Sequence, residues 1–431
     1  MVALDIFRSV PTHEPRWFRL SAFGAAAFIA LHVLVGAALS NYGFDELLGN
    51  QPLERNIQRN IDQERLGPEK VPGYPIFLLL TEMVTGRGSL ASGSIIVQIL
   101  VAWATMIGLF FVSRRATASS ALAVLAVALV SFNGLWVEEV IEQRETFLYA
   151  AILIALVGFT VYMPMSSRWY LFSAGTTCAL AVLTRLTGVV LLPAVAFLLL
   201  SDWRTGVSRF GLSSAVVCVL SASVPVLSWY SYQQVTFGKA SMSSDNGTNL
   251  IKGNNHALSA TYPFVDVDRL SPVLVEPIKE AAIARGSDPN RELIRLSLKF
   301  VMQSPLEALA LIPRKLAAFF VPLHFPLGTG TIVLTESNEW RIENYEARSI
   351  TSADGIMALP GILAFFFGAM RWHTLSKSAR LTILLVGFTA VLHVITFAQT
   401  RFRLPYDPIL ALLFVQMLSS RLRRTTGSQC S

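Results

Sequence analysis

Long apolar blocks alternate with short polar segments along most of the chain. The blocks lie at about 18–40, 92–113, 119–136, 147–164, 169–200, 210–229, 354–370, 380–398 and 404–420. A helix needs roughly 20 apolar residues to cross a hydrocarbon core about 30 Å thick, and most of these blocks approach that length. The pattern therefore predicts an all-α polytopic membrane protein.

The block 169–200 is too long for one span, and Arg185 lies near its middle. An arginine at the centre of a bilayer costs several kcal/mol. Two short spans that meet in a hairpin at Arg185 avoid this cost. With that division the chain has about ten transmembrane helices.

Composition agrees with a membrane protein and excludes several other classes. Of the 431 residues, 53% are hydrophobic and only 15% are charged, a lower charge than soluble domains carry. The net charge of +7 does not indicate a nucleic-acid partner, because the basic residues form short clusters between the apolar blocks. No CxxC or His/Cys spacing among the three cysteines indicates a metal site or a disulfide framework.

The basic clusters predict the orientation of the chain. Short cytoplasmic loops carry an excess of Lys and Arg. The clusters are Arg114 and Arg115, Arg168, Arg204 and Arg209, the loop 371–380, and the tail with Arg421, Arg423 and Arg424. About ten spans and an internal N-terminus place all five clusters inside. We expect a multi-pass protein of the cytoplasmic (inner) membrane with both termini in the cytoplasm.

The opposite face then carries the segments 41–91, 137–146, 230–305 and 399–403. The segment 230–305 is too long for a simple connector, and we expect an amphipathic helix at about 273–303 within it. The apolar stretch 306–323 is interrupted by charge, and we expect it to lie along the outer surface.

Three domains follow from this reading of the loops. They are an N-terminal transmembrane module at 1–229 that includes the first outer loop 41–91, an extracytoplasmic loop forming a small cap at 230–353, and C-terminal transmembrane helices at 354–431.

Two acidic clusters lie at the predicted outer face. Asp45 and Glu46 follow the first span, where a partly desolvated carboxylate is suited to act as a general base or to bind a cation. A solvated loop acid or a helix N-terminal cap is the alternative for Asp45. Glu142 and Glu145 belong to a loop with four carboxylates and one Arg, which is suited to orient an acceptor or hold a divalent cation. Its alternative is a set of acids that favours the N-terminus of the next helix.

Arg401 and Arg403 lie in a segment predicted to be outside, where the positive-inside bias disfavours basic residues. Phosphate binding would explain them, because guanidinium groups match phosphate oxygens. The alternative is that they extend towards lipid headgroups. Arg185 has the same two interpretations. Tyr74 belongs to Pro72-Gly-Tyr-Pro75, a rigid turn before an apolar run that is also typical of an ordinary loop-to-helix junction.

In this order the motifs resemble those of the GT-C superfamily of polyprenyl-phosphate-sugar-dependent membrane glycosyltransferases, in particular protein O-mannosyltransferases and the lipid A aminoarabinose transferase. The motifs are Phe44-Asp-Glu46, Pro72-Gly-Tyr-Pro75, Arg144-Glu-Thr-Phe-Leu148, Leu183-Thr-Arg185, and a set from Trp229 through Asn249–Asn255 to Arg401-Phe-Arg-Leu-Pro405. The first loop is more compact than the family pattern, and Glu145 stands where relatives use Asp.

The resemblance implies an inverting glycosyltransferase that moves a sugar from a polyprenyl-phosphate donor to an acceptor hydroxyl on a glycan, lipid or protein. It implies a reaction at the outer face of the membrane. Asp45, Glu46 and Glu145 would be catalytic, and Arg401, Arg403 and Arg185 would bind the donor phosphate. The residues lining the substrate would be Tyr74, Glu142, Lys252, Asn254 and Asn255. No cofactor is required by the resemblance, and a divalent cation stays an alternative.

Other classes of membrane protein remain as alternatives. A transporter or flippase of lipid-linked sugars would have broken or charged helices near mid-membrane in paired halves. An O-antigen ligase or polymerase would work at the same face with a different order of motifs, and a non-catalytic scaffold would not need outer arginines and acids. A transferase requires that Asp45, Glu145 and Arg401 or Arg403 converge on one outer cavity.

Overall fold

The computed structural model of the chain describes residues 14–47, 71–85, 90–141, 145–204, 211–238, 246–264, 266–323, 325, 327–337, 339–347 and 355–427. The chain divides into two compact units. Unit 1 comprises Met1–Ala240, Met357–Val386 and Leu404–Ser431, and unit 2 comprises Ser241–Ile356 and Gly387–Arg403.

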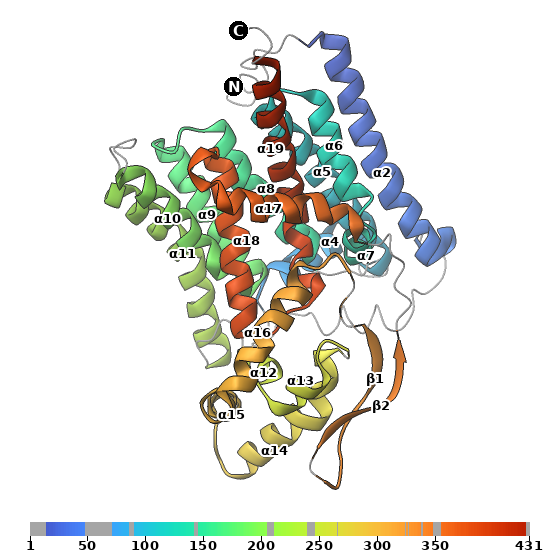
Figure 1. Cartoon of the computed structure of the whole chain (residues 1–431), viewed down its shortest axis with the longest axis vertical. Helices are drawn as coiled ribbons and strands as arrows, with labels where there is room; N and C mark the ends of the chain where they lie inside the picture. The colour runs from blue at the N-terminus through green and yellow to red at the C-terminus, as the bar shows by residue number, and fades with distance from the viewer. Residues whose placement is uncertain are drawn as a thin grey trace. The chain divides into compact units, whose positions relative to one another are not determined.

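Unit 1 is made of helices (Figure 1). They are α2 (Arg16–Leu47), α4 (Gly73–Thr85), α5 (Leu90–Thr117), α6 (Ser120–Ser131), α7 (Gly134–Ile141), α8 (Thr146–Tyr162), α9 (Arg168–Thr184), η2 (Leu186–Val190), α10 (Leu191–Arg204), α11 (Gly211–Phe237), α17 (Leu359–Met370), η6 (Trp372–Thr374), η8 (Leu404–Tyr406) and α19 (Asp407–Gly427). Helix α18 (Lys377–Ile395) has its first half in unit 1 and its second half in unit 2.

Helix α5 is the centre of unit 1. It packs against α2, α6, α8 and α19, and Figure 1 shows α5, α6 and α19 side by side. Small residues bring neighbouring helices close together, as is usual between membrane helices. At Gly158 of α8 a Cβ atom would lie 3.1 Å from a methyl group of Val112 in α5. At Gly175 of α9 it would collide with Ser221 of α11.

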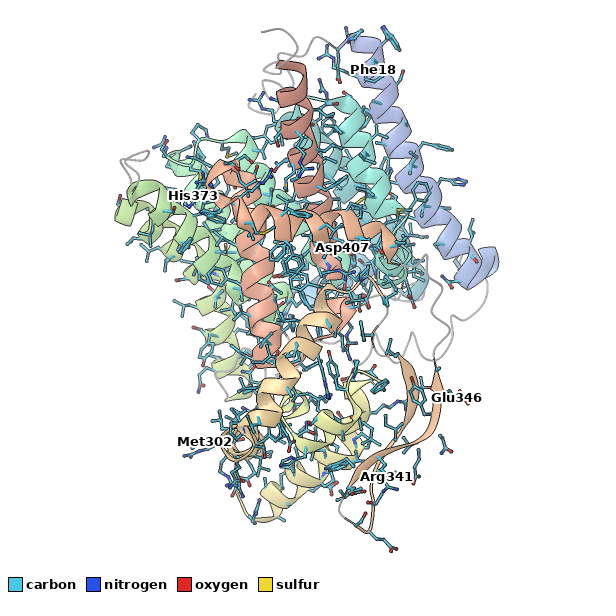
Figure 2. The ribbon with its side chains drawn as sticks, viewed as in Figure 1. Phe18, Met302, Arg341, Glu346, His373 and Asp407 are labelled. Carbon is cyan, nitrogen blue, oxygen red and sulfur yellow. The ribbon has the colours of Figure 1, made fainter. Side chains whose placement is uncertain are left out.

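Helices α6 and α7 meet at an angle of 63°, and Asn133 occupies the break. Its side-chain oxygen accepts a hydrogen bond from the backbone of Trp136, which caps the start of α7. Its amide nitrogen donates to Asp407 Oδ2 over 2.7 Å. Asp407 is the first residue of α19 (Figure 2), where a carboxylate is favoured by the helix dipole. One buried amide therefore fixes the bend and ties it to the start of α19.

A second break lies at Arg185, where the length of the apolar block predicted one. Helix α9 ends at Thr184, Arg185 has an extended backbone with φ −150° and ψ 129°, and η2 follows. Helix α11 packs against both α9 and α10. The break places the guanidinium of Arg185 at a helix end rather than in the middle of a helix.

Among the described residues, three helical segments are long and apolar enough to cross a membrane: Arg16–Asn41, Gly93–Thr117 and Lys377–Ile395. The bent pair α6–α7 makes a fourth if it counts as one span. Shorter apolar helices lie at Gly73–Val84, Thr146–Tyr162, Leu186–Ser201 and Ile356–Met370. The largely helical architecture agrees with the predicted fold class, while the number of about ten spans stays a prediction.

Unit 2 contains α12 (Asn246–Gly253), α13 (His256–Thr261), η3 (Val267–Arg269), the π-helical turn η4 (Ser271–Val275), α14 (Glu276–Ala284), α15 (Pro289–Gln303), α16 (Pro305–Phe320) and η7 (Thr400–Phe402). The stretch expected to lie along the outer surface, 306–323, falls mostly within α16.

The expectation of one amphipathic helix at 273–303 is wrong, because this region forms η4 and two α-helices. Gly286, with φ +67°, ends the first α-helix, and Asp288 caps the second ahead of Pro289. Helix α15 is itself amphipathic, and its buried residues Leu293, Ser297 and Phe300 follow the helical spacing.

The sequence analysis missed a two-stranded antiparallel sheet in unit 2. Strand β1 (Gly328–Leu334) pairs with β2 (Trp340–Ala347), with Ile332 opposite Ile342 and an irregularity between Thr329 and Thr331. The strands form a ribbon with mostly exposed faces, and Arg341 and Glu346 are labelled on it in Figure 2. The fold class is therefore all-α apart from one hairpin within the described residues.

Candidate active site

The Pro72-Gly-Tyr-Pro75 turn lies against the helix break at Arg185. A Cβ atom at Gly73 would lie 2.6 Å from the Cα and Oγ1 atoms of Thr184, so only glycine allows this approach. Tyr74 is buried and donates a hydrogen bond to Gln98 Oε1 over 3.2 Å. Two motifs that are distant in the sequence therefore pack directly against each other within unit 1.

The second acidic motif reaches the same place. Glu145 precedes the first residue of α8, and its Oε1 lies 3.4 Å from Nε of Arg185. The Arg185 side chain is only 12% exposed, compared with 33% for Glu145. The ring of Phe147, the second residue of α8, contacts the rings of Tyr74 and Phe77 in α4. Tyr74, Glu145 and Arg185 are therefore neighbours in unit 1.

Buried polar pairs extend this cluster, which we name the Glu145–Arg185 cluster. The hydroxyl oxygens of Tyr149 and Tyr406 lie 3.1 Å apart, and Thr146 donates to Glu139 Oε2 over 2.9 Å. Glu139 is 6% exposed and Tyr149 is completely buried. Buried polar groups of this kind are costly unless paired, and here they connect α7, α8 and η8.

Unit 2 contains a different charge cluster, made of Lys252, Asp268 and Arg401. Lys252 Nζ lies 2.9 Å from Asp268 Oδ1, and Arg401 Nη2 lies 3.2 Å from Asp268 Oδ2. Asp266 supports it, because its Oδ1 accepts hydrogen bonds from the backbone of Asp268 and from Gln399 Nε2. Two cations therefore share the Asp268 carboxylate, and Asp266 is a second carboxylate beside them.

The charges in this cluster determine how its carboxylate titrates. Partial burial alone would raise the pKa of Asp268, but the Arg401 guanidinium and the Lys252 ammonium outweigh it and hold that pKa below the ordinary value. Asp268 is therefore ionised at neutral pH. The Arg401 side chain is 29% exposed, although its Nε atom is buried without a hydrogen-bond partner among the described residues.

Asn254 and Asn255, predicted to line the substrate, make hydrogen bonds to the protein backbone. Asn254 Nδ2 donates to the carbonyl groups of Leu250 and Ile395, and its oxygen accepts from Lys315 Nζ over 3.1 Å. The oxygen of Asn255 accepts from the backbone of Leu258 and caps α13. Their contacts favour a supporting role beside Lys252.

Arg403 is also committed to the protein interior. It is completely buried, and its Nη1 lies 3.3 Å from the carbonyl oxygen of Phe319, 3.2 Å from that of Phe320 and 2.9 Å from that of Val321. These carbonyl groups lie at the C-terminal end of α16, where carbonyl oxygens have no hydrogen-bond donor within the helix. A cation that donates hydrogen bonds to them stabilises this helix end. The geometry favours a structural role for Arg403 and leaves the accessible guanidinium of the motif to Arg401.

Three of the predicted site residues lie outside what the structure describes in atomic detail. The backbone at Asp45 and Glu46 belongs to the last turn of α2, and their side chains are not described. Glu142 lies outside the described residues. Asp45 therefore lies at the end of a helix rather than at the N-terminal cap of a following one.

A metal centre was left as an alternative for the acids. Within the described ranges, no group of three or more His, Cys, Asp and Glu side chains is arranged to hold a metal ion. Asp45, Glu46 and Glu142 fall outside that set.

The sequence of unit 1 matches a known enzyme family. Residues 69–229 match the family of dolichyl-phosphate-mannose-protein mannosyltransferases, over less than half of the chain. The matched segment contains Tyr74, Glu145 and Arg185, whereas Asp45 and Arg401 lie outside it. No curated protein sequence matches the chain.

The fold is similar to that of the oligosaccharyltransferase of the archaeon Archaeoglobus fulgidus. The apo form aligns with a TM-score of 0.52 at 14% identity, over 96% of this chain and 52% of that protein. The form tethered to an acceptor peptide with an NVT sequon aligns with a TM-score of 0.50 at 15% identity, over 95% and 50%. The chain therefore resembles glycosyltransferases in sequence over residues 69–229, and its fold is similar to that of an oligosaccharyltransferase.

The family match supports the enzyme class, and the solved structures support the fold alone. The chain spans about half the length of the solved structures that it resembles. The predicted resemblance to the GT-C superfamily is confirmed at this level.

Sequence reasoning missed the acids and hydroxyl groups that complete both clusters. Asp268 was the largest omission, since it contacts Lys252 and also Arg401, which lies 133 residues further along the chain. A signal was available, because arginines in an outer segment need an acidic partner and Asp266-Val-Asp268 lies in the large outer segment. Tyr406 and Asp407 follow Pro405 directly, so reading two residues further would have included them.

Proposed function

We propose that this protein transfers a sugar from a polyprenyl-phosphate carrier to an acceptor hydroxyl, with inversion, at the extracytoplasmic face of the inner membrane. The observation that carries the proposal is that two cations, Lys252 and Arg401, are held together on the Asp268 carboxylate. The family match to enzymes that use dolichyl-phosphate-mannose supports a lipid phosphate as the anion that this charge attracts.

The leaving group of such a reaction is a lipid phosphate, whose negative charge grows as the glycosidic bond breaks. Fixed cations that are already in place stabilise this charge without reorganisation, an effect typically worth a few kcal/mol. We assign this role to Arg401 and Lys252, with a contribution from Arg185. Arg403 serves to hold the end of α16 next to the same segment.

The acceptor side requires a base and a group that orients the hydroxyl. Asp45 is proposed as the base that accepts the hydroxyl proton while the oxygen attacks the anomeric carbon. The sugar passes through a state with oxocarbenium character, as in other glycosyl transfers. Glu145, held by Arg185 over 3.4 Å, is proposed to orient the acceptor, with Glu46, Glu142 and Tyr74 lining its approach.

We propose the class of acceptor from the description of the matched family. The matched family modifies proteins, so a protein or peptide hydroxyl is the first acceptor to test, followed by glycans and lipids.

The deciding experiment incubates the purified full-length protein in lipid nanodiscs with a panel of polyprenyl-phosphate sugars and follows consumption of each. We expect one donor to be consumed, and Asp45→Asn to abolish this while the protein remains folded. The matched control is Glu82→Gln, which removes a carboxylate elsewhere in unit 1. Full activity of Asp45→Asn would remove Asp45 as the base, and consumption of no donor by the wild type would contradict the proposed donor class.

A further inference from the structure

Lys315 is a buried lysine that no carboxylate pairs with among the described residues. It lies in α16 of unit 2 with 2% of its surface exposed. Its Nζ donates to Asn254 Oδ1 over 3.1 Å and to the carbonyl oxygen of Val394 over 2.9 Å. An apolar side chain would fill the same space without the cost of burying an amine. The specific contribution of Lys315 is therefore the pair of hydrogen bonds that it makes.

These hydrogen bonds meet the C-terminal end of α18, whose last residue is Ile395. The last carbonyl groups of a helix have no donor within it. Here Lys315 satisfies the carbonyl of Val394, and Asn254 Nδ2 satisfies that of Ile395 over 2.8 Å. Because Asn254 directly follows α12, the ends of α12 and α18 are joined beside α16 (Figure 1). We name this arrangement the Lys315–Asn254 clamp.

The two cations of the Lys252–Asp268–Arg401 cluster extend from the segments that the clamp joins. Lys252 lies at the end of α12, and Arg401 lies in η7, which follows the end of α18. Gly253, next to Lys252, has no room for a Cβ atom beside the carbonyl of Thr396. Lys252 and Arg401 reach the two oxygens of the Asp268 carboxylate, so they are close enough to reach oxygens of one phosphate group as well.

Other hydrogen bonds hold the segment before Arg401 to different parts of unit 2. Gln399 Nε2 donates to Asp266 Oδ1 over 2.8 Å, and Thr400 Oγ1 donates to the carbonyl of Leu323 over 2.6 Å. These bonds fix the segment to the loop before η3 and to the chain beyond α16. The clamp fixes it to α12, which carries Lys252. The spacing of the two cations therefore depends on the clamp.

We propose that Lys315 is a positioning residue for the donor phosphate: through the clamp it holds Lys252 and Arg401 at the spacing that lets both contact one phosphate group. This inference rests on the proposed function, because it takes the donor phosphate as the ligand of the two cations. Lys315 acts through the main chain of α12 and of the segment after α18, since its own side chain is buried.

The first measurement tests the clamp without any donor. Lys315→Met removes both hydrogen bonds and keeps an unbranched side chain of similar length. Hydrogen exchange of the full-length protein in lipid nanodiscs, followed by mass spectrometry, should become faster in peptides that cover 246–256 and 392–403. Unchanged exchange in both peptides would overturn the proposal, whatever ligand the protein binds.

The second measurement is equilibrium binding of dolichyl-phosphate-mannose, the donor in the description of the matched family, or of the panel donor that the wild type consumes. We expect Lys315→Met to weaken donor affinity about 10-fold, the size of one charge-assisted contact, with a smaller change in turnover at saturating donor. Faster exchange with wild-type donor affinity would reduce Lys315 to a stabilising role and overturn the proposal. Absence of donor binding by the wild type would contradict the proposed function and positioning with it, while the exchange measurement would still decide whether the clamp exists.

A double-mutant cycle separates positioning from direct contact with the donor. Lys315→Met and Asn254→Ala interrupt the same clamp, so the double variant should bind the donor no more weakly than the weaker of the two single variants. Additive losses would show that the two residues act independently and would contradict the clamp.

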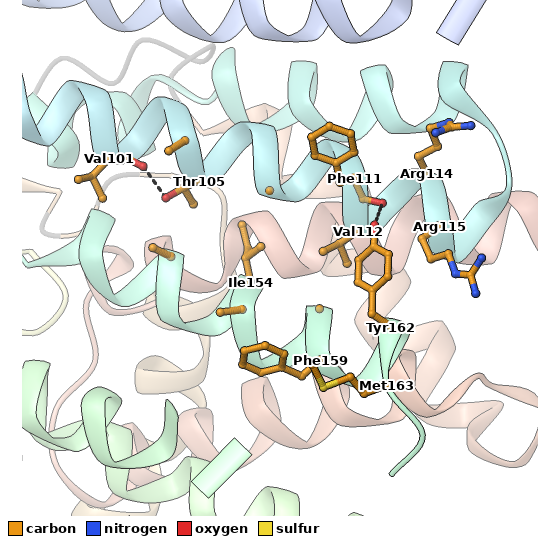
Figure 3. A pocket seen from close by; sticks show the side chains of 15 residues that line it. Val101, Thr105, Phe111, Val112, Arg114, Arg115, Ile154, Phe159, Tyr162 and Met163 are labelled. Carbon is orange, nitrogen blue, oxygen red and sulfur yellow. Dashed lines mark hydrogen bonds between the residues drawn. The ribbon is translucent and has the colours of Figure 1, made fainter. Parts of the chain in front are cut away.

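Two controls remove buried apolar contacts instead. Leu293→Ala opens the core that Leu293 forms with Ile251 and Val275 in unit 2. Ile154→Ala does the same in the wall of a groove between α5 and α8 in unit 1 (Figure 3). Both should lower the midpoint of thermal unfolding and leave donor affinity unchanged. If Leu293→Ala weakened donor binding as much as Lys315→Met, general loosening of unit 2 would explain both results, and the positioning role would be wrong.

Discussion

The two charge clusters of this protein have opposite balances. The Glu145–Arg185 cluster pairs one acid with one guanidinium at 3.4 Å and is surrounded by buried hydroxyl pairs. The Lys252–Asp268–Arg401 cluster pairs one acid with two cations. Glu139 adds a second, buried carboxylate to the first cluster, whereas the second cluster brings two cations to the Asp268 carboxylate. The comparison suggests a division of labour, with orientation of the acceptor in unit 1 and retention of phosphate in unit 2.

The largest expected effect comes from breaking the balanced pair. Glu145→Gln removes the charge that holds Arg185, which is nearly buried at the helix break. We expect the turnover rate to fall about 100-fold, because a displacement of the order of 1 Å in a positioning group costs that much. The measurement is steady-state kinetics at saturating donor. If the change in donor affinity exceeded the change in turnover, the assignment of phosphate binding to unit 2 would be wrong.

A smaller effect is expected from the unbalanced cluster. Arg401→Ala should weaken donor affinity about 10-fold, which corresponds to about 1.4 kcal/mol, because one charge-assisted contact to phosphate is lost. Lys252→Met should act in the same direction. Equilibrium binding of a polyprenyl-phosphate sugar measures both, and an Arg401→Ala variant with wild-type affinity would exclude the guanidinium from the donor site.

Arg403→Ala is the informative companion to Arg401→Ala, because the two arginines are two residues apart in the chain. Loss of Arg403 leaves the carbonyl groups at the end of α16 without their donor. We therefore expect a lower midpoint of thermal unfolding for Arg403→Ala and little change for Arg401→Ala. The reverse order of stabilities would contradict the division of roles within this motif.

The last prediction concerns a pH dependence of the stability of unit 2. Lys315 is almost completely buried, and burial lowers its pKa to about 7, below the ordinary value of a lysine. Between this pKa and that of an unfolded lysine, near 10.4, the unfolded chain binds more protons than the folded one. Its contribution to the free energy of unfolding therefore increases as pH rises from 7 to 10.

Thermal unfolding at a series of pH values measures this contribution. Lys315→Met should flatten the dependence above pH 7 relative to the wild type. Lys299→Met, a change on α15, is the control and should leave the dependence as it is. An identical pH profile for Lys315→Met and the wild type would exclude Lys315 as its source.

Apolar periodicity was enough to predict the helical membrane architecture and the break at Arg185, because a charged side chain in a long apolar block has few stable positions. It could not predict the β1–β2 hairpin, whose strands are short and mostly exposed. The division of 273–303 into separate helices depends on one glycine with positive φ, which an averaged hydrophobic pattern does not register.

The order of motifs in the sequence identified most of the candidate site residues, but it did not identify the groups that these residues contact. Tyr74, Glu145 and Arg185 are neighbours because Gly73 lets α4 approach Thr184, and this follows from packing rather than from any spacing. The two arginines of one short motif looked equivalent in the sequence. Only their surroundings separate Arg403, among carbonyl groups, from Arg401, beside a carboxylate.

Gly253 follows Lys252 directly, and a Cβ atom there would collide with the carbonyl of Thr396 in the chain leading to Gln399 and Arg401. Two stretches of main chain thus touch with no side chain between them. That contact holds together the two main-chain segments from which Lys252 and Arg401 extend to Asp268. Any side chain in place of Gly253 would therefore push the two cations apart without touching either of them.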